Sequence, residues 1–453
     1  MDKIEEFLEN SNLDNSEESK TLRKKIIDLV AEYYKTTHKN KKYVEGQSSI
    51  PVSGKVFSET ELQMLVSSSL DFWLTSGRFN EEFEKQLSEK LNVKFVISTN
   101  SGSSANLLAL TTLTSEQLGK KSIRPGDEVI TVAAGFPTTV NPIIQNNLKP
   151  VFVDVKMETY EIDTDLIESA ISDKTKAIMI AHTLGNAFEL DEIQKIVKKY
   201  DLWLIEDCCD AFGTTYNGKQ VGTFGDIGTL SFYPAHHITM GEGGAVFTNN
   251  PQLKRIIESF RDWGRDCFCA TGMNDTCGKR FGWKLGELPE GYDHKYTYSH
   301  VGYNLKITDM QAAVGLAQIQ SLDLFIEKRK KNFNFLKSHL EKYEKFLILP
   351  KATSKSEPAW FGFPITVRDN MPFTKTQLIK FLTQNKVDTR PLFAGNITKQ
   401  PYFKNIDFKI SGNLKNTDRI MNQSFWIGVY PGLNEEMLNY IIKQFDEFFK
   451  NFI

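Results

Sequence analysis

The chain has 453 residues, more than one hydrophobic core usually serves, so we expect a large domain and a smaller one. Its 55 basic and 57 acidic residues nearly cancel, which argues against nucleic acid or an anionic membrane as partner and favours a small molecule. The start MDKIEEFLEN lacks the order of a secretory signal, and no apolar run approaches the roughly 18 residues of a bilayer span. We therefore expect a cytoplasmic protein.

Residues 1–49 predict a helical extension followed by a linker. Residues 17–37 have helical periodicity, with charges opposite an apolar stripe that we expect to pack against something. The stripe consists of Leu22, Ile26, Leu29, Val30 and Tyr33. The polar, Gly- and Ser-containing stretch that follows is typical of a linker.

Residues 50–325 predict a large α/β domain. Short apolar, β-rich runs alternate with helical patterns between residues 95 and 248, which indicates a mainly parallel sheet covered by helices. These runs are KFVISTN, DEVITV, KPVFVDV, KAIMIAH, LWLIEDCC, IGTLSFY and GAVFTN. Ligands bind such sheets at the carboxyl ends of the strands, so the functional residues should follow the strands.

Two further regions complete the chain. Residues 262–302 are polar, Gly-rich and without clear periodicity, and they hold three cysteines, so we predict a long functional loop. Helical patterning resumes near residue 308 and is long enough for two helices. Residues 326–453 then mix strand and helix patterns, as expected of a small α+β domain.

Two segments at strand ends have functional and purely structural interpretations. In TNSGSSANLLAL, the amides of Gly102 and Ser103 open a helix and could bind phosphate, although a well-capped helix has the same pattern. In LWLIEDCCDAFG, Asp207 ends a buried strand. It could cap the next helix or pair with a protonated pyridine nitrogen.

A third segment, SFYPAHHITMGEGGAVFT, together with those two in this order, resembles the DegT/StrS-type sugar aminotransferases. VGYNLKITDMQAAVGLAQ and VDTRPLFAGN are similar to later motifs of that family, so the resemblance covers roughly residues 50 to 450. It implies the fold-type-I architecture of pyridoxal-phosphate enzymes, which is like that of aspartate aminotransferase.

The resemblance also implies roles for residues at matching positions. Gly102, Ser103 and Ser231 look like phosphate ligands, and Asp207 looks like the partner of the pyridine nitrogen. Phe136, in GFPTT, is similar to the aromatic residue that stacks on the cofactor ring.

Two later positions imply a dimer and a substrate contact. Asn304 matches an asparagine that, in this family, reaches the phosphate of the neighbouring subunit. A homodimer with shared active sites follows from that match. Arg390, in the TRP motif, is similar to a residue near the sugar substrate.

The chain departs from the aminotransferases at the sixth position of SFYPAH, where His236 stands in place of their cofactor-bonding lysine. Imidazole cannot make that covalent bond, but it can transfer protons near neutral pH. The pattern AHHITMGEGG resembles the sugar 3-dehydrases that depend on pyridoxamine phosphate. Their histidine is the catalytic base, which is the role implied for His236.

Four cysteines follow the pattern C-x57-C-x-C-x7-C: Cys209, Cys267, Cys269 and Cys277. By themselves they are compatible with a 2Fe–2S cluster, with zinc or with unrelated thiols. The spacing resembles that of the 3-dehydrases acting on CDP-4-keto-6-deoxyglucose, which implies a 2Fe–2S cluster. If the strand continues past Asp207, Cys209 shares its face about 6 to 7 Å away, whereas Cys208 fits a buried thiol.

The implied reaction removes the C3 hydroxyl of a nucleotide-linked 4-keto-6-deoxyhexose, with electrons from an NAD(P)H-dependent reductase passing through the cluster. Such chemistry serves dideoxysugar synthesis for lipopolysaccharide O-antigen. Three alternatives remain: a glutamate-coupled 3-dehydrase without a cluster, a zinc-binding scaffold without activity, and an ordinary sugar aminotransferase with another lysine.

Overall fold

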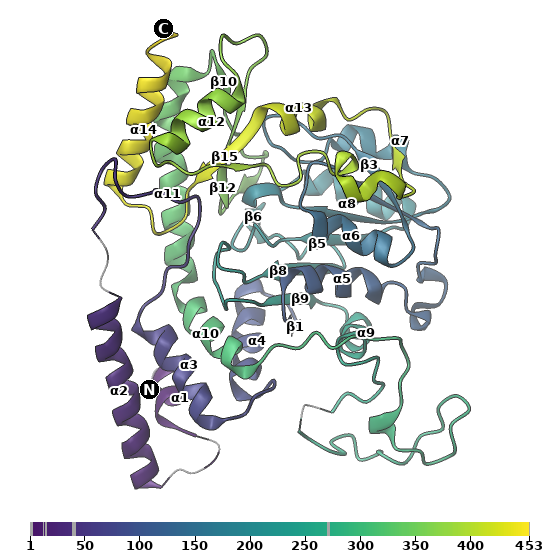
Figure 1. Cartoon of the computed structure of the whole chain (residues 1–453). Helices are drawn as coiled ribbons and strands as arrows, with labels where there is room; N and C mark the ends of the chain where they lie inside the picture. The colour runs from purple at the N-terminus through teal and green to yellow at the C-terminus, as the bar shows by residue number, and fades with distance from the viewer. Residues whose placement is uncertain (1–2, 12, 14–15, 39–41, 270–271, 453) are drawn as a thin grey trace.

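The computed structural model describes residues 3–11, 13, 16–38, 42–269 and 272–452. Its largest sheet has eight strands in the order β1-β9-β8-β5-β4-β2-β3-β14, in the middle of the molecule (Figure 1). The strands are β1 (Phe95–Thr99), β2 (Glu128–Val132), β3 (Lys149–Val153), β4 (Thr175–Ala181), β5 (Trp203–Asp207), β8 (Ile227–Ser231), β9 (Gly244–Thr248) and β14 (Lys409–Ile410).

The large sheet is mainly parallel, as predicted. Only β9 runs antiparallel, pairing with β1 on one side and β8 on the other. All seven β-rich runs form strands of this sheet. The two-residue strand β14 pairs in parallel with β3. It lies within residues 326–453, which were expected to belong to the small domain and not to this sheet.

Helices cover both faces of the sheet. Successive side chains along each strand point to opposite faces, so each strand contributes to the apolar core on both sides. Val129, Met179 and Ile205 share one apolar cluster with α5, α6 and α9. Their neighbours Ile130 and Leu204 face a second cluster, with α4, α8 and α10. The helices are α4 (Arg78–Leu91), α5 (Gly102–Thr112), α6 (Pro137–Gln145), α7 (Ile167–Ala170), α8 (Leu190–Tyr200), α9 (Pro251–Arg261) and α10 (Asp309–Gln318).

The C-terminal part forms an antiparallel sheet of order β10-β12-β15-β13 with helices packed on it. Its elements are α11 (Leu322–Leu340), β10 (Leu347–Ile348), β12 (Gly362–Val367), α12 (Lys375–Gln384), β13 (Arg390–Pro391), α13 (Lys415–Gln423), β15 (Ser424–Gly428) and α14 (Glu435–Phe449). A third sheet joins β11 (Ser356–Glu357), β6 (Thr215–Tyr216) and β7 (Lys219–Gln220). The domain boundaries at residues 49 and 325 stay a prediction.

The N-terminal part is helical, with α1 (Lys3–Glu9), α2 (Glu17–Thr37) and α3 (Glu59–Asp71). Helix α2 spans the predicted range, but the expected packing face was wrong. Its buried residues are Arg23 and Ile27, and most of the apolar stripe is exposed. The reason is a buried ion pair, because Arg23 Nη1 lies 2.9 Å from Asp71 Oδ1 of α3 and turns the adjacent face of α2 inward.

The segment between α9 and α10 has little regular structure, as predicted, and extends away from the large sheet (Figure 1). Two isolated bridges, Asp262 with Asn304 and Arg265 with Tyr298, hold its two ends together. Among the described residues, no helix is both long and apolar enough to cross a membrane.

Candidate active site

A cavity of about 510 Å³ opens at the carboxyl ends of the central strands. Val132, Ala181 and Asp207, the last residues of β2, β4 and β5, line it, together with Ser231 at the end of β8. This is where the sheet's topology predicted a ligand site. Of the sequence-predicted residues, the cavity wall includes Gly102, Ser103, Phe136, Asp207, Cys209, Ser231, His236 and Arg390.

The N-terminus of α5 forms one wall. Ser101 caps the helix, and its hydroxyl accepts a hydrogen bond from the Ser104 amide at 3.0 Å. A Cβ on Gly102 would lie 2.4 Å from the Ser231 Cβ, so only glycine allows β8 to approach this closely. The remaining amides of the first turn and the helix dipole favour an anion here.

Asp207 is buried at the end of β5 and accepts three hydrogen bonds. Its Oδ2 accepts from Asn106 Nδ2 and Thr139 Oγ1, both at 2.7 Å. Its Oδ1 accepts from the Cys209 amide at 3.1 Å. These donors come from α5, α6 and the turn after β5, so three elements fix the direction in which the carboxylate points.

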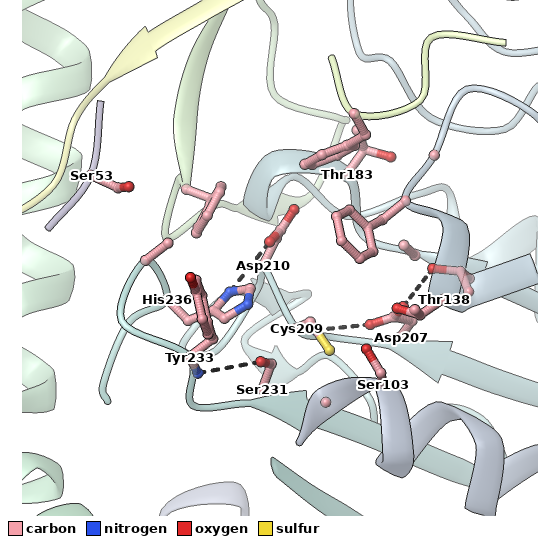
Figure 2. Close-up of a pocket in the computed structure, with 18 of the residues that line it drawn as sticks. Ser53, Ser103, Thr138, Thr183, Asp207, Cys209, Asp210, Ser231, Tyr233 and His236 are labelled. Carbon is pink, nitrogen blue, oxygen red and sulfur yellow. Dashed lines mark hydrogen bonds and ion pairs between the residues drawn. The ribbon is translucent and has the colours of Figure 1, made fainter. Parts of the chain in front are cut away.

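His236 lies in the turn after β8, with its Nδ1 3.4 Å from Asp210 Oδ1 (Figure 2). Burial, reinforced by the charge of Arg329, lowers the pKa of His236 to about 4. Burial also raises the pKa of Asp210 to about 8, and the nearby Asp207 charge adds to the rise. At neutral pH the imidazole of His236 is therefore in its neutral form.

Arg329 of α11 anchors the His236 turn from outside the cavity. Its Nη2 donates to the carbonyls of Ala235 at 3.3 Å and His236 at 3.0 Å. Its Nη1 donates to the carbonyls of Trp360 and Phe361. One buried guanidinium thus joins the His236 turn to the segment that leads into β12.

Phe136 and Arg390 line the cavity and are both exposed to solvent. Phe136 is 51% exposed, and its ring meets Phe393 edge-on with centroids 6.0 Å apart. Arg390 lies on β13. Asn304 is exposed and does not line the cavity, and its predicted contact with a second subunit stays a prediction.

The four cysteines do not meet in one place. Cys209 lines the cavity, whereas Cys267, Cys269 and Cys277 lie together in the segment after α9. Over the described ranges, no group of three or more His, Cys, Asp or Glu residues is arranged to hold a metal ion. The described chain therefore does not form the predicted four-thiolate site, and the 2Fe–2S cluster stays a prediction.

The strand geometry expected around the cysteines was partly wrong. β5 ends at Asp207, so Cys209 lies in a turn and does not continue the strand. It still reaches the same cavity as Asp207 because the turn folds over the strand end. Cys208 is buried, as predicted, with its thiol 3.6 Å from the Glu206 carbonyl.

The sequence reasoning missed several residues of this site. Asn106 and Thr139 each lie one helical turn beyond a predicted residue, Gly102 and Phe136, so helical spacing could have found them. Arg329 gave no local signal, because it stands 93 residues from the His236 carbonyl that it binds.

The fold and the site define a class of protein. Residues 56–446 match the model of the DegT/DnrJ/EryC1/StrS aminotransferase family, and the chain belongs to that family. The solved GDP-4-keto-6-deoxy-D-mannose-3-dehydratase of E. coli with bound hydrated PLP is similar over 88% of this chain and 100% of its own, with a TM-score of 0.79 and 28% identity. The chain has the fold of the PLP-dependent aminotransferases and dehydratases.

Two curated relatives are more similar in sequence. The lipopolysaccharide biosynthesis protein RfbH of Salmonella typhimurium is 64% identical over 94% of this chain and 98% of its own. The dTDP-4-dehydro-2,6-dideoxy-D-glucose 3-dehydratase of Saccharopolyspora spinosa is 48% identical over 94% of this chain and 91% of its own.

Proposed function

We propose that this chain removes the C3 hydroxyl from a nucleotide-linked 4-keto-6-deoxyhexose, with pyridoxamine phosphate as cofactor, in the synthesis of a 3,6-dideoxyhexose for lipopolysaccharide. The observation that carries the proposal is the cavity itself. His236 occupies its wall, and none of the described residues that line it is a lysine. Transamination through a lysine is therefore disfavoured, whereas proton transfer by a neutral imidazole is favoured.

The relatives support the same reaction class. One of them is named a dTDP-sugar 3-dehydratase and another a GDP-sugar 3-dehydratase, and RfbH is named for lipopolysaccharide biosynthesis. Their nucleotides differ from one another. The assignment of CDP to this chain rests on its cysteine spacing, which resembles that of the CDP-linked enzymes.

The residues of the cavity suit the cofactor. Gly102, Ser103 and Ser231 would hold its phosphate, since the glycine keeps the helix amides open and both hydroxyls can donate. Asp207 would pair with its pyridine nitrogen, and Phe136 would cover its ring. When bound, the cofactor supplies an amine for the sugar ketone and an electron-accepting ring.

The chain's own residues then manage protons and position. Because Nδ1 of His236 faces Asp210, Nε2 is the atom that we assign to take the proton. Arg329 holds the backbone of the His236 turn and so limits the directions in which the imidazole can point. Arg390, at the exposed rim, would contact the substrate.

Two variants of His236 test the proposal. His236→Asn should lower C3 deoxygenation by roughly 10² to 10⁴-fold, as loss of a general base does, while cofactor binding persists. His236→Lys should gain covalent retention of the aldehyde cofactor, visible as added protein mass after borohydride reduction. Products from candidate nucleotide 4-ketosugars would be identified anaerobically by mass. A near-native rate in His236→Asn would contradict the proposal.

The source of electrons has two candidates. The resemblance favours a 2Fe–2S cluster on Cys209, Cys267, Cys269 and Cys277. An NAD(P)H-dependent reductase would supply electrons to that cluster. The alternative is a glutamate-coupled 3-dehydrase that needs no metal. Turnover with L-glutamate alone supports the second, and turnover only with a reductase and NAD(P)H supports the first.

A further inference from the structure

Helix α2 lies on the outer side of the molecule, beside α3 (Figure 1). It presents an apolar stripe to solvent. Leu22, Ile26, Leu29 and Tyr33 are 54%, 40%, 61% and 61% exposed. Their spacing of four, three and four residues is the a/d pattern of a coiled-coil seam. Four large apolar side chains in one such row are more than the scattered apolar residues of an ordinary surface.

The stripe is held rigidly in this exposed position. Arg23 of α2 donates to Asp71 Oδ1 at 2.9 Å and to the Ser67 carbonyl at 2.8 Å, both on α3. Asp71 is also bound by Arg78 of α4 at 2.7 Å. Because this buried network fixes the rotation of α2 on α3, the chain cannot bury the stripe by turning the helix.

Helix α2 precedes the part of the chain that the family model matches. The family model begins at residue 56, after α2 has ended. The E. coli 3-dehydratase structure is matched over its whole length by only 88% of this chain. The stripe therefore lies outside the part of the chain that the family model describes.

The charges beside the stripe select the partner. One flank holds Glu18, Lys25 and Glu32 at intervals of seven residues, the g positions of the pattern. Lys25 and Glu32 make no ion pair within the described residues. The other flank holds Arg23, which is already engaged with Asp71, and the uncharged Val30 and Thr37.

Antiparallel pairing of two copies satisfies this pattern. In an antiparallel pair, each g position faces the g positions of the other helix, so Lys25 meets Glu32 of the second copy and Glu32 meets its Lys25. The same two-fold arrangement places Ile26 against Leu29 and Leu22 against Tyr33. In a parallel pair, Glu18, Lys25 and Glu32 would instead face the other flank of the second helix. That flank holds Arg23, which is already paired with Asp71, and the uncharged Val30 and Thr37, so the charges find no partner.

We propose that α2 is a self-association surface, through which two copies of this chain pair their α2 helices antiparallel about a two-fold axis. The contact is isologous, since each copy offers the same patch. A pair of 21-residue helices makes a small interface, so the association should be reversible and concentration-dependent. If the homodimer with shared active sites also forms, the α2 contact joins two such dimers into a tetramer.

The test follows the mass of the full chain by sedimentation velocity and light scattering at about 1 to 100 μM, where an interface of this size should titrate. Ile26→Glu/Leu29→Glu should halve the mass of the largest species. Lys25→Glu alone should weaken association at least about tenfold, because it sets like charges opposite each other. Lys24→Glu, with the same charge change on the far side of α2, is the matched control and should associate normally.

The decisive variant is the double exchange Lys25→Glu/Glu32→Lys, which restores complementarity only in the antiparallel pair. Recovery of wild-type association supports the proposal. Failure to recover, or an unchanged mass in Ile26→Glu/Leu29→Glu, overturns it. If Ile26→Glu/Leu29→Glu keeps its mass but binds an electron-donor protein more weakly, the stripe is the binding surface for that protein. This result would also overturn self-association.

Discussion

At the scale of single residues, the environment of His236 decides what the cavity can do. Burial favours the neutral form of both His236 and Asp210, so the pair carries no net charge at neutral pH although two ionisable groups face each other. A neutral base that needs no prior loss of a proton suits a reaction that begins by removing one.

The pH profile should reflect these two groups. The pKa of His236 is lowered to about 4, so the base stays competent down to about pH 5, and kcat/KM should be flat from there to about pH 7. The pKa of Asp210 is raised to about 8, and its ionisation above that pH places a negative charge beside the neutral imidazole, which makes His236 a stronger base and should raise kcat/KM. In Asp210→Asn the alkaline rise should disappear. An unchanged alkaline limb in that variant would show that Asp210 does not influence the base.

The cysteines give a second prediction at this scale. Cys267→Ser should abolish the iron and acid-labile sulfide expected from a 2Fe–2S cluster, about two of each per chain, and with them reductive turnover. The initial dehydration should persist, because His236 is untouched. Cys208→Ala is the matched control, since Cys208 is buried away from the cavity and should keep its iron. Equal iron in both variants would remove the cluster from the proposal.

At the scale of elements, the N-terminal helices depend on one buried cation. Arg23 joins α2 to α3 through Asp71 and to the end of α1 through the Leu8 carbonyl, 3.0 Å from its Nε. Sequence periodicity identified α2 and its apolar side correctly. It could not show that a charged residue, and not the stripe, faces the neighbouring helix.

Removing that cation should release the N-terminal helices. Arg23→Ala leaves Asp71 with Arg78 as its one remaining cation partner among the described residues, so the loss should fall below the about 3 to 5 kcal/mol of a buried charge with no partner but exceed about 1 kcal/mol. Denaturant unfolding should show this loss or an early transition, and hydrogen exchange should rise in α2. Lys24→Ala removes only an exposed pair with Asp28 and should cost less than about 1 kcal/mol. Equal effects of the two substitutions would contradict a supporting role for Arg23.

At the scale of the whole molecule, the position of Asn304 bears on how the site is completed. It lies outside the cavity of its own chain, on exposed backbone paired with Asp262. The proposed homodimer assigns it to the site of the neighbouring subunit. The segment between α9 and α10 that carries it also holds Cys267, Cys269 and Cys277.

Mixing two inactive variants tests shared sites. His236→Asn and Asn304→Asp should each be inactive or weak, because one loses the base and the other places a negative charge near the phosphate. Hybrid dimers, formed by mixing and slow exchange, contain one site with neither substitution, so about a quarter of wild-type activity should return for random pairing. No recovery in a mixture with proven hybrids would place Asn304 in the site of its own chain.

The sequence by itself determined the large-domain strands and eight of the residues that line the cavity. Alternation and helical periodicity are local, so β5, β8 and α5 could be located from short stretches. A short motif also located His236 in the turn after β8, at the position where the resemblance places a lysine.

Only the tertiary structure decided which distant residues complete that wall. Asn106 and Thr139 reach Asp207 from 101 and 68 residues away, and Arg329 reaches the His236 turn from another helix. Such contacts depend on strand order and helix rotation, which are set by packing over the whole chain. The same cause left the apolar side of α2 exposed, because the rotation of a helix follows the most favourable burial available, here the Arg23–Asp71 pair.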